Sequence, residues 1–371
     1  MNDKNLSKKQ LYIEWILWSL LFAFIDMPGM YKYIAIVVIS IVTVIRNWRK
    51  YKTVLKSVYF MLPVMVYCGI GLICSVLNNN ITVWTIKTVV FWMLPPLFLL
   101  ALCFRYDQEE SRLADVQFKA CVTAYVGVRI GFILINGQFE SPFAFVFGLF
   151  AIYYIYKHKW KWAVLALLLM YFGNKRIAIL AVLSCVILML VMKCAKYRRK
   201  WMGVFWGLIA IANGVYIYWI CSGILVKICS LLGIDTSYRL DVYSQLAEHI
   251  PKRYYLGKGI GEANIMINKY VDPNLIWAFE NPHNDILKTY IELGAVGLTL
   301  FLLSYLIIFY VAWKKNVEKR ALSQLFVTFV YFILLMTTDN VSIYIIFLIP
   351  LYSVCVSLIN EKEKIYENYA K

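Results

Sequence analysis

Hydrophobic residues in this sequence are gathered into blocks of about 15–25 positions, the length that an α-helix needs to cross a bilayer, and short polar segments separate the blocks. Backbone polar groups find no water inside the hydrocarbon layer, so each block is predicted to be a helix. The pattern therefore predicts an all-α polytopic membrane protein of about 12 transmembrane helices. The predicted spans are residues 11–25, 31–45, 58–77, 82–104, 117–135, 142–156, 160–173, 177–193, 202–228, 286–311, 322–338 and 341–359.

The composition agrees with this pattern. Of the 371 residues, 62% are hydrophobic, and the mean hydropathy is +0.67, whereas a soluble domain is about half apolar. The chain has no internal repeat and no low-complexity segment. It is therefore expected to form a single integral membrane domain over residues 1–371.

Charged residues indicate the orientation of the chain. The net charge is +17, and 26 of the 38 Lys and Arg residues lie in alternate connections between the blocks. This is the positive-inside distribution, so nucleic-acid binding is not indicated, and both termini are predicted to be cytoplasmic. The basic connections are residues 1–10, 46–57, 105–119, 157–161, 193–201, 312–321 and 360–371.

One connection on the opposite, extracytoplasmic face is much longer than the others. Residues 229–285 form this loop, and their content of Tyr, Ile and Leu predicts that it is ordered. A long ordered loop in a compact protein is usually functional. Residues 237–249 have helical spacing, and Gly257-x-Gly259-x-Gly261 lacks the strand-and-helix context of a phosphate loop, so a tight turn is predicted there.

Two cationic features lie on the outer face. Lys175 and Arg176 follow a turn at Asn174, where they fit either an anion site or a pair of side chains that extend to water from a helix end. Arg239 opens the predicted loop helix, where its charge adds to the positive end of the helix dipole. A bound anion would balance that charge, and so would a carboxylate such as Asp235 or Asp241.

His283 lies between the long loop and the next apolar block. An imidazole can transfer a proton near neutral pH, although a histidine at a helix start can also be purely structural. Asn284 or Asp285 is expected to cap the following helix. His158 and His249 share no ligand spacing with His283, so no metal site is predicted.

These features occur in a characteristic order. The order runs from Lys175-Arg176 before an apolar helix, through Tyr238-Arg239 and Leu256-Gly257-x-Gly259, to His283-Asn284-Asp285-Ile286-Leu287, Tyr290, Glu292-Leu293-Gly294 and Gly297-Leu298. With the multi-span layout and one large outer loop, the chain resembles the superfamily of O-antigen ligases and O-antigen, capsular or exopolysaccharide repeat-unit polymerases. The specific motifs cover about residues 171–300.

The resemblance implies a fold similar to that of class C glycosyltransferases and a metal-independent reaction without a cofactor. A glycan passes from a polyprenyl-diphosphate carrier to an acceptor hydroxyl on the outer face of the bacterial cytoplasmic membrane. Arg176 and Arg239 match the arginine positions of the family and would bind the diphosphate, with help from Lys175. His283 matches the motif histidine and would deprotonate or align the acceptor, or contact the diphosphate. Asn284 is a secondary site residue, and Glu280 and Asp285 are secondary candidates for polarising His283.

Two enzymes share this motif, and they differ in the acceptor. A polymerase extends a second carrier-linked repeat unit, whereas a ligase transfers the glycan to lipid A core or another acceptor. We favour the polymerase. A polysaccharide flippase is the alternative of another class, but charged residues within the spans are few, mainly Lys87 and Arg129. The expected partners are the carrier-linked oligosaccharide, the bilayer, and a chain-length regulator and flippase of the same pathway.

Overall fold

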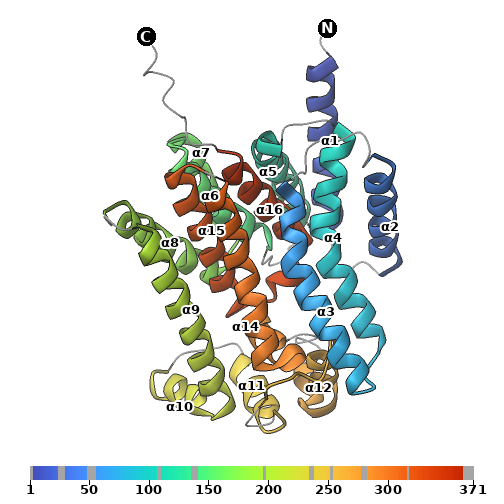
Figure 1. Ribbon diagram of the computed structural model, residues 1–371, viewed down its shortest axis with the longest axis vertical. Coiled ribbons are helices and arrows are strands. Elements are labelled where there is room, and N and C mark those ends of the chain that lie inside the picture. Colours follow the sequence, from blue (N-terminus) through green and yellow to red (C-terminus); the bar gives the residue numbers. More distant parts are fainter. Residues whose placement is uncertain are drawn as a thin grey trace.

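The computed structural model describes residues 3–23, 30–47, 56–106, 110–134, 141–194, 198–233, 238–250, 254–276, 282–315 and 317–361. These residues form helices and contain no β-strand, which confirms the predicted all-α class (Figure 1). The helices are α1 (Asp3–Ala23), α2 (Met30–Asn47), η2 (Lys56–Phe60), α3 (Met61–Leu77), α4 (Val83–Tyr106), α5 (Glu110–Leu134), α6 (Phe143–Tyr156), α7 (Trp160–Phe172), α8 (Arg176–Cys194), α9 (Arg198–Cys221), α10 (Ile224–Leu231), α11 (Arg239–Ala247), α12 (Glu262–Tyr270), α13 (Pro273–Ile276), α14 (Asp285–Lys314), α15 (Lys319–Met336), η3 (Val341–Ile343) and α16 (Ile345–Ile359).

Every predicted apolar block overlaps a helix of the structure. In the described residues, six helices are long and apolar enough to cross a membrane, and four shorter helices are also apolar. The crossing number of about 12 remains a prediction. One block differs from its predicted form, because the segment 202–228 is not one helix. α9 ends at Cys221, and Gly223, with φ +70°, turns the chain into α10.

The centre of the bundle is formed by α6, α15 and α16. All residues of α16 and nearly all of α6 are buried, so these helices pack against protein on all sides. By contrast, α8 and α9 expose leucine, isoleucine and valine along their length, including Leu183, Ile187, Leu208 and Ile211. Continuous apolar surface of this extent is expected to face lipid.

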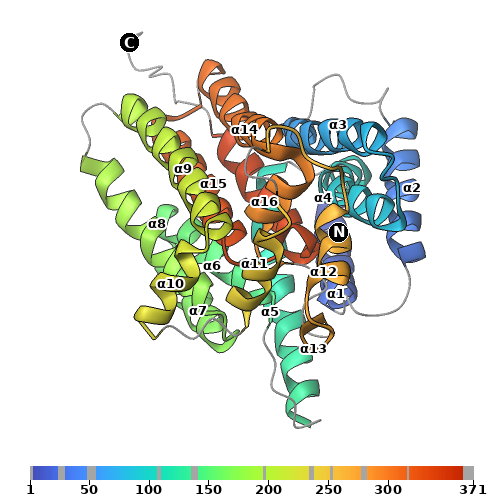
Figure 2. The same cartoon turned by 90° about the horizontal axis from the view of Figure 1, so that it is seen from below.

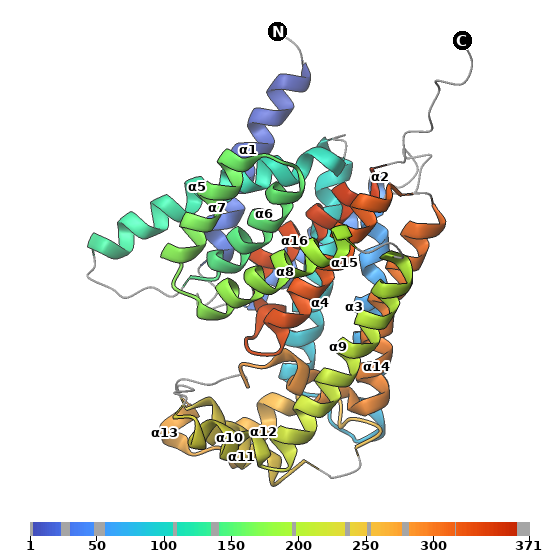
Figure 3. The ribbon, with the colours of Figure 1, turned by 90° about the vertical axis from the view of Figure 1, so that its left-hand side faces the viewer.

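The helices of the long loop gather at one end of the bundle, below α9 and α14 (Figure 3). α11 and α12 bury Val242, Leu246 and Ile267 in a small core of their own, and Ile291 of α14 belongs to the same core. The predicted helix near residues 237–249 is present as α11. Seen from that end, α11 lies beneath the middle of the bundle (Figure 2). The loop is thus a packed layer that covers one end of the spans.

A break in α14 joins this layer to the bundle. Gly294 has φ +74° and ψ −176°, which interrupts the helix. The predicted glycine turn fills the break, since Gly259 N donates to Glu292 O at 3.0 Å and Ala295 N donates to Tyr254 O at 2.9 Å. A Cβ on Gly257 would lie 2.1 Å from Glu292 O, so only glycine permits this approach. The turn is therefore structural, as predicted, and it fixes the short first segment of α14.

Candidate functional site

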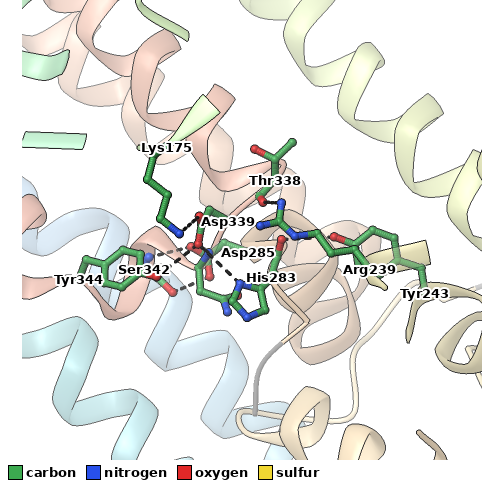
Figure 4. A network of polar contacts seen from close by, with 10 residues as sticks. Lys175, Arg239, Tyr243, His283, Asp285, Thr338, Asp339, Ser342 and Tyr344 are labelled. Carbon is green, nitrogen blue, oxygen red and sulfur yellow. Dashed lines mark hydrogen bonds and ion pairs between the residues drawn. The ribbon is translucent and has the colours of Figure 1, made fainter. Parts of the chain in front are cut away.

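Four segments that are distant in the sequence meet at the start of α14 (Figure 4). They contribute Lys175 from the α7–α8 turn, Arg239 from α11, His283 from the residues before α14, and Asp339 from the turn after α15. The sequence predicted the first three as site residues. Asp339 was not predicted as a site residue.

Asp339 is at the centre of this group. Its side chain is fully buried, with Lys175 Nζ 3.6 Å from Oδ2 and His283 Nδ1 3.8 Å from Oδ1. The backbone N–H of Asn340 donates to Oδ1 at 2.7 Å. Burial alone would raise the carboxyl pKa of Asp339, but the His283 ring and the Lys175 ammonium outweigh burial and lower the pKa to about 2. Asp339 is therefore a carboxylate at neutral pH and links the lysine to the histidine.

The backbone around His283 is fixed on both sides. His283 has φ +48°, a left-handed conformation that is uncommon outside glycine. Tyr243 OH donates to the His283 carbonyl oxygen at 3.2 Å. Asn284 caps α14, because its side-chain oxygen accepts from Leu287 N at 2.9 Å, as one of the two capping predictions stated. The imidazole is thus held at a helix start with a quarter of its side chain exposed.

Asp285 has a different neighbour from the one that the sequence suggested. Its two carboxylate oxygens accept from the backbone N–H of Ser342 at 2.7 Å and from the Ser342 hydroxyl at 2.6 Å. These bonds, together with Asp285 N donating to Asp339 O at 3.3 Å, join the start of α14 to the turn after α15. The carboxylate beside His283 is that of Asp339. Glu280, the other candidate for polarising His283, lies outside the described residues.

Arg239 is held by a backbone group rather than by Asp241. Its Nη1 donates to the carbonyl oxygen of Thr338 at 2.7 Å. Asp235 lies outside the described residues, so within the described part of the chain no carboxylate balances Arg239. The remaining N–H groups of its guanidinium are available to the pocket that the side chain lines.

This pocket has a volume of about 340 Å³ and is lined by Lys175, Arg176, Arg239 and Asp339. Arg176 is the first residue of α8 and Arg239 the first of α11, so the positive ends of two helix dipoles lie at the pocket. Asp339 is the only acidic residue that lines the pocket in the described residues, and Lys175 already balances it. The pocket is therefore cationic and suited to an anion.

The rest of the lining is apolar and faces α8 and α10. It includes Ile177 and Leu180 of α8, Leu225 of α10 and Leu240 of α11. α10 has no buried residue, and Leu231 and Leu232 at its end are 86% and 67% exposed. A short helix with such exposed leucines is suited to the boundary between headgroups and hydrocarbon. The pocket thus combines a cationic wall with an apolar wall.

The sequence did not predict three of the contacts at this site. Asp339 lies beside the His283 ring, Ser342 donates to Asp285, and Tyr243 donates to the His283 carbonyl oxygen. A single signal pointed to Asp339, since it is an acidic residue in an otherwise uncharged outer turn. The predicted cations and histidine, by contrast, are close together as the resemblance implied. Lys175, Arg176 and Arg239 share the pocket, and His283 adjoins it through Asp339.

Comparison with known proteins agrees with this geometry. Residues 128–302, just under half of the chain, match the family described as O-antigen ligase. The match begins within α5 and ends within α14, so it contains the predicted cations and His283 but not Asp339. No curated protein matches the chain. The resemblance inferred from the sequence is therefore confirmed: residues 128–302 are similar to the O-antigen ligase family, in a chain with six helices long and apolar enough to cross a membrane in its described residues.

Proposed function

We propose that this protein is a polysaccharide repeat-unit polymerase of the bacterial cytoplasmic membrane. It transfers a glycan from a polyprenyl-diphosphate carrier to a sugar hydroxyl on the outer face, and both its termini lie in the cytoplasm. The observation that carries the proposal is the cationic pocket beside the His283–Asp339 pair. Products of this class are capsular, exopolysaccharide or O-antigen chains of the cell envelope.

The diphosphate is assigned to the cationic wall. It carries at least two negative charges at the membrane surface, and charge grows on it as the glycosidic bond to the carrier breaks. Preorganised cations that face the developing charge lower the barrier of such a reaction. Arg176 and Arg239 perform this role as bidentate donors, and Lys175 adds charge while it is paired to Asp339. The apolar wall at Leu180 and Leu225 suits the first isoprenoid units.

His283 is assigned the proton of the acceptor. The acceptor oxygen forms a bond to the anomeric carbon, the bond from that carbon to the diphosphate breaks with its electron pair, and the hydroxyl proton passes to His283 Nε2. Asp339 lies on the Nδ1 side of the ring, 3.8 Å away, where it favours a proton on Nδ1 and leaves Nε2 as the acceptor atom. It also stabilises the imidazolium that forms. Asn284 and Asp285 are positioning residues that hold the histidine at the start of α14.

The ligase is the second candidate, because the matched family is described as O-antigen ligase. The same cationic pocket and histidine serve either acceptor. A flippase is less well supported, since the three cations Lys175, Arg176 and Arg239 line a single pocket rather than a path through the spans. His283 adjoins the same pocket through Asp339.

The test uses purified protein in lipid vesicles with carrier-linked repeat units as the only substrate. A ladder of longer glycans on the carrier is expected from the wild-type protein. Product that requires added lipid A core would instead identify the ligase, and no transfer to any acceptor would refute both enzymes. Arg176→Ala, Arg239→Ala and His283→Ala are each expected to abolish transfer while the protein accumulates normally.

Lys269→Ala is the matched control for these variants. Lys269 is an exposed lysine of α12 in the same loop layer, and its ammonium lies 4.9 Å from the Tyr270 ring rather than in the pocket. Its replacement removes one positive charge at the same end of the protein and should leave transfer unchanged. Normal polymer formation by the His283 variant would contradict the proposed proton transfer.

A further inference from the structure

A second pocket lies at the other end of two helices that form the candidate site. Along α8, Arg176 lines the pocket of the candidate site and Lys193 lines the second pocket. At the start of α15, Arg320 lines the second pocket, and Thr338, just after the end of α15, lines the pocket of the candidate site. At 1.5 Å per residue, Arg176 and Lys193 are about 26 Å apart along α8. This separation is close to the thickness of the hydrocarbon layer, ~30 Å. The two pockets are therefore at opposite ends of a helix long enough to span the hydrocarbon layer.

One wall of this pocket is formed by apolar side chains, and Ser323 and Gln324 of α15 also line the pocket. It has a volume of about 490 Å³, and Val186, Met189 and Leu190 of α8 face Ile155 of α6 and Val327 of α15 across it. Leu190 is 60% exposed, so the apolar wall continues onto the lipid-facing surface of α8. A hydrocarbon chain can thus extend from the bilayer into the pocket without passing a polar group on this wall.

The rim of the pocket carries basic side chains. Lys193, Arg320 and His158 all line it, and all three are exposed. Arg320 donates a hydrogen bond to His158 Nε2, and its guanidinium carbon lies 5.6 Å from the centre of the Tyr156 ring. These contacts use part of the guanidinium and fix its position, and the other N–H groups are available for an anion.

Acidic side chains do not line the pocket in the described residues. Glu361 is near, but its carboxylate already accepts from Lys157 Nζ at 2.6 Å and from Tyr156 OH at 2.9 Å. The rim therefore has a net positive charge, and it lies above an apolar wall at the end of a membrane span. A zwitterionic headgroup has no net charge, whereas an anionic headgroup carries a negative charge that a basic rim attracts.

We propose that this pocket binds an anionic phospholipid of the leaflet opposite the candidate site. The phosphate accepts hydrogen bonds from Arg320 and Lys193, and one acyl chain lies along Val186, Met189 and Leu190. Because α8 and α15 reach both pockets, the bound lipid fixes the remote ends of the helices that hold Arg176 and the Asp339 turn. The proposal is independent of the glycan that the protein transfers.

The experiment measures lipid retained by the purified full-length protein. Protein is exchanged into detergent with equal amounts of phosphatidylglycerol and phosphatidylcholine, and the bound lipids are counted by native mass spectrometry. We expect the wild-type protein to prefer the anionic lipid. Each basic residue near a membrane surface contributes about fivefold to such binding, so Lys193→Gln and Arg320→Gln should each lower the preference by about this factor.

Two further variants separate the pocket from general charge effects. Lys161→Gln removes an exposed lysine of α7 outside the pocket lining and should leave the preference unchanged. Val186→Phe fills the apolar wall without changing charge and should lower retention of the anionic lipid. Equal retention of both lipids by the wild-type protein would overturn the proposal. So would equal losses in the Lys161 and Arg320 variants, or full displacement of the lipid by millimolar inorganic phosphate.

Discussion

Replacing Asp339 by asparagine keeps the shape of the side chain and removes the carboxylate between Lys175 and His283. The side chain of Asp339 is fully buried, and that of Lys175 is 12% exposed, so water replaces little of the lost interaction. The variant leaves a largely buried ammonium without its carboxylate, which is a destabilising arrangement.

The carboxyl pKa of Asp339 gives the size of the effect. A pKa of about 2, in place of the ordinary 3.8, corresponds to about 2 kcal/mol of stabilisation at neutral pH. Because the folded-state pKa is the lower one, this contribution is present in full above about pH 5 and is lost as the pH falls toward 2. At pH 3, about half of it should remain.

The assay compares the free energy of unfolding of both proteins in mixed detergent micelles between pH 7 and pH 3, with helical circular dichroism as the signal. The difference between wild type and Asp339→Asn should be about 2 kcal/mol at pH 5–7 and about half of that at pH 3. Asp115→Asn is the control. Asp115 pairs with Lys159 at 2.9 Å, but both side chains are more than 40% exposed, so less than ~1 kcal/mol is expected. A difference that does not change with pH, or one no larger than that of the control, would refute the assigned role of Asp339.

Three other substitutions test the architecture around the site. Gly294→Ala places a Cβ 2.5 Å from Tyr255 O at a residue with positive φ, so thermal unfolding should show a loss of at least ~2 kcal/mol in the free energy of unfolding. Gly203→Ala is the control, because a Cβ there meets open space and should leave the stability nearly unchanged. Tyr243→Phe removes the hydrogen bond to the His283 carbonyl; polymer formation should fall several-fold with a stability change of only ~1 kcal/mol, and unchanged polymer formation would contradict the positioning role. Ser342→Ala removes the hydroxyl that donates to Asp285, and chemical unfolding should show a loss of about 1–3 kcal/mol, as expected when a buried acceptor loses its donor.

Buried charge in α14 was missed at the sequence level. Lys288 and Glu292 are both buried, although they lie in a block that reads as apolar. Glu292 accepts from the Tyr67 hydroxyl and from Gly261 N at 3.0 Å. The partners of Glu292 come from α3 and from the glycine turn, so this side chain holds the break in α14 together. This structural role weakens any interpretation of Glu292 as part of a transport path.

The sequence by itself determined the helical class, the membrane location and the identity of the cationic and histidine positions. The length of an apolar block indicates whether the segment can cross hydrocarbon, and the residue before a helical segment indicates its cap, as at Asn284. Both features can be predicted because each depends only on residues that are neighbours in the sequence. The motif order then brought Arg176, Arg239 and His283 into one hypothesis, and all three lie within residues 128–302, which match the family described as O-antigen ligase.

Tertiary structure alone decided which carboxylate adjoins the histidine. Asp285 is two residues from His283 and was the natural candidate, yet Ser342 binds it, and Asp339 from a remote turn lies beside the imidazole instead. Likewise, the left-handed Gly223 divided a continuous apolar block into α9 and α10. Residue spacing carries no information on such contacts, because they depend on how α8, α14 and α15 pack together rather than on the composition of any one helix.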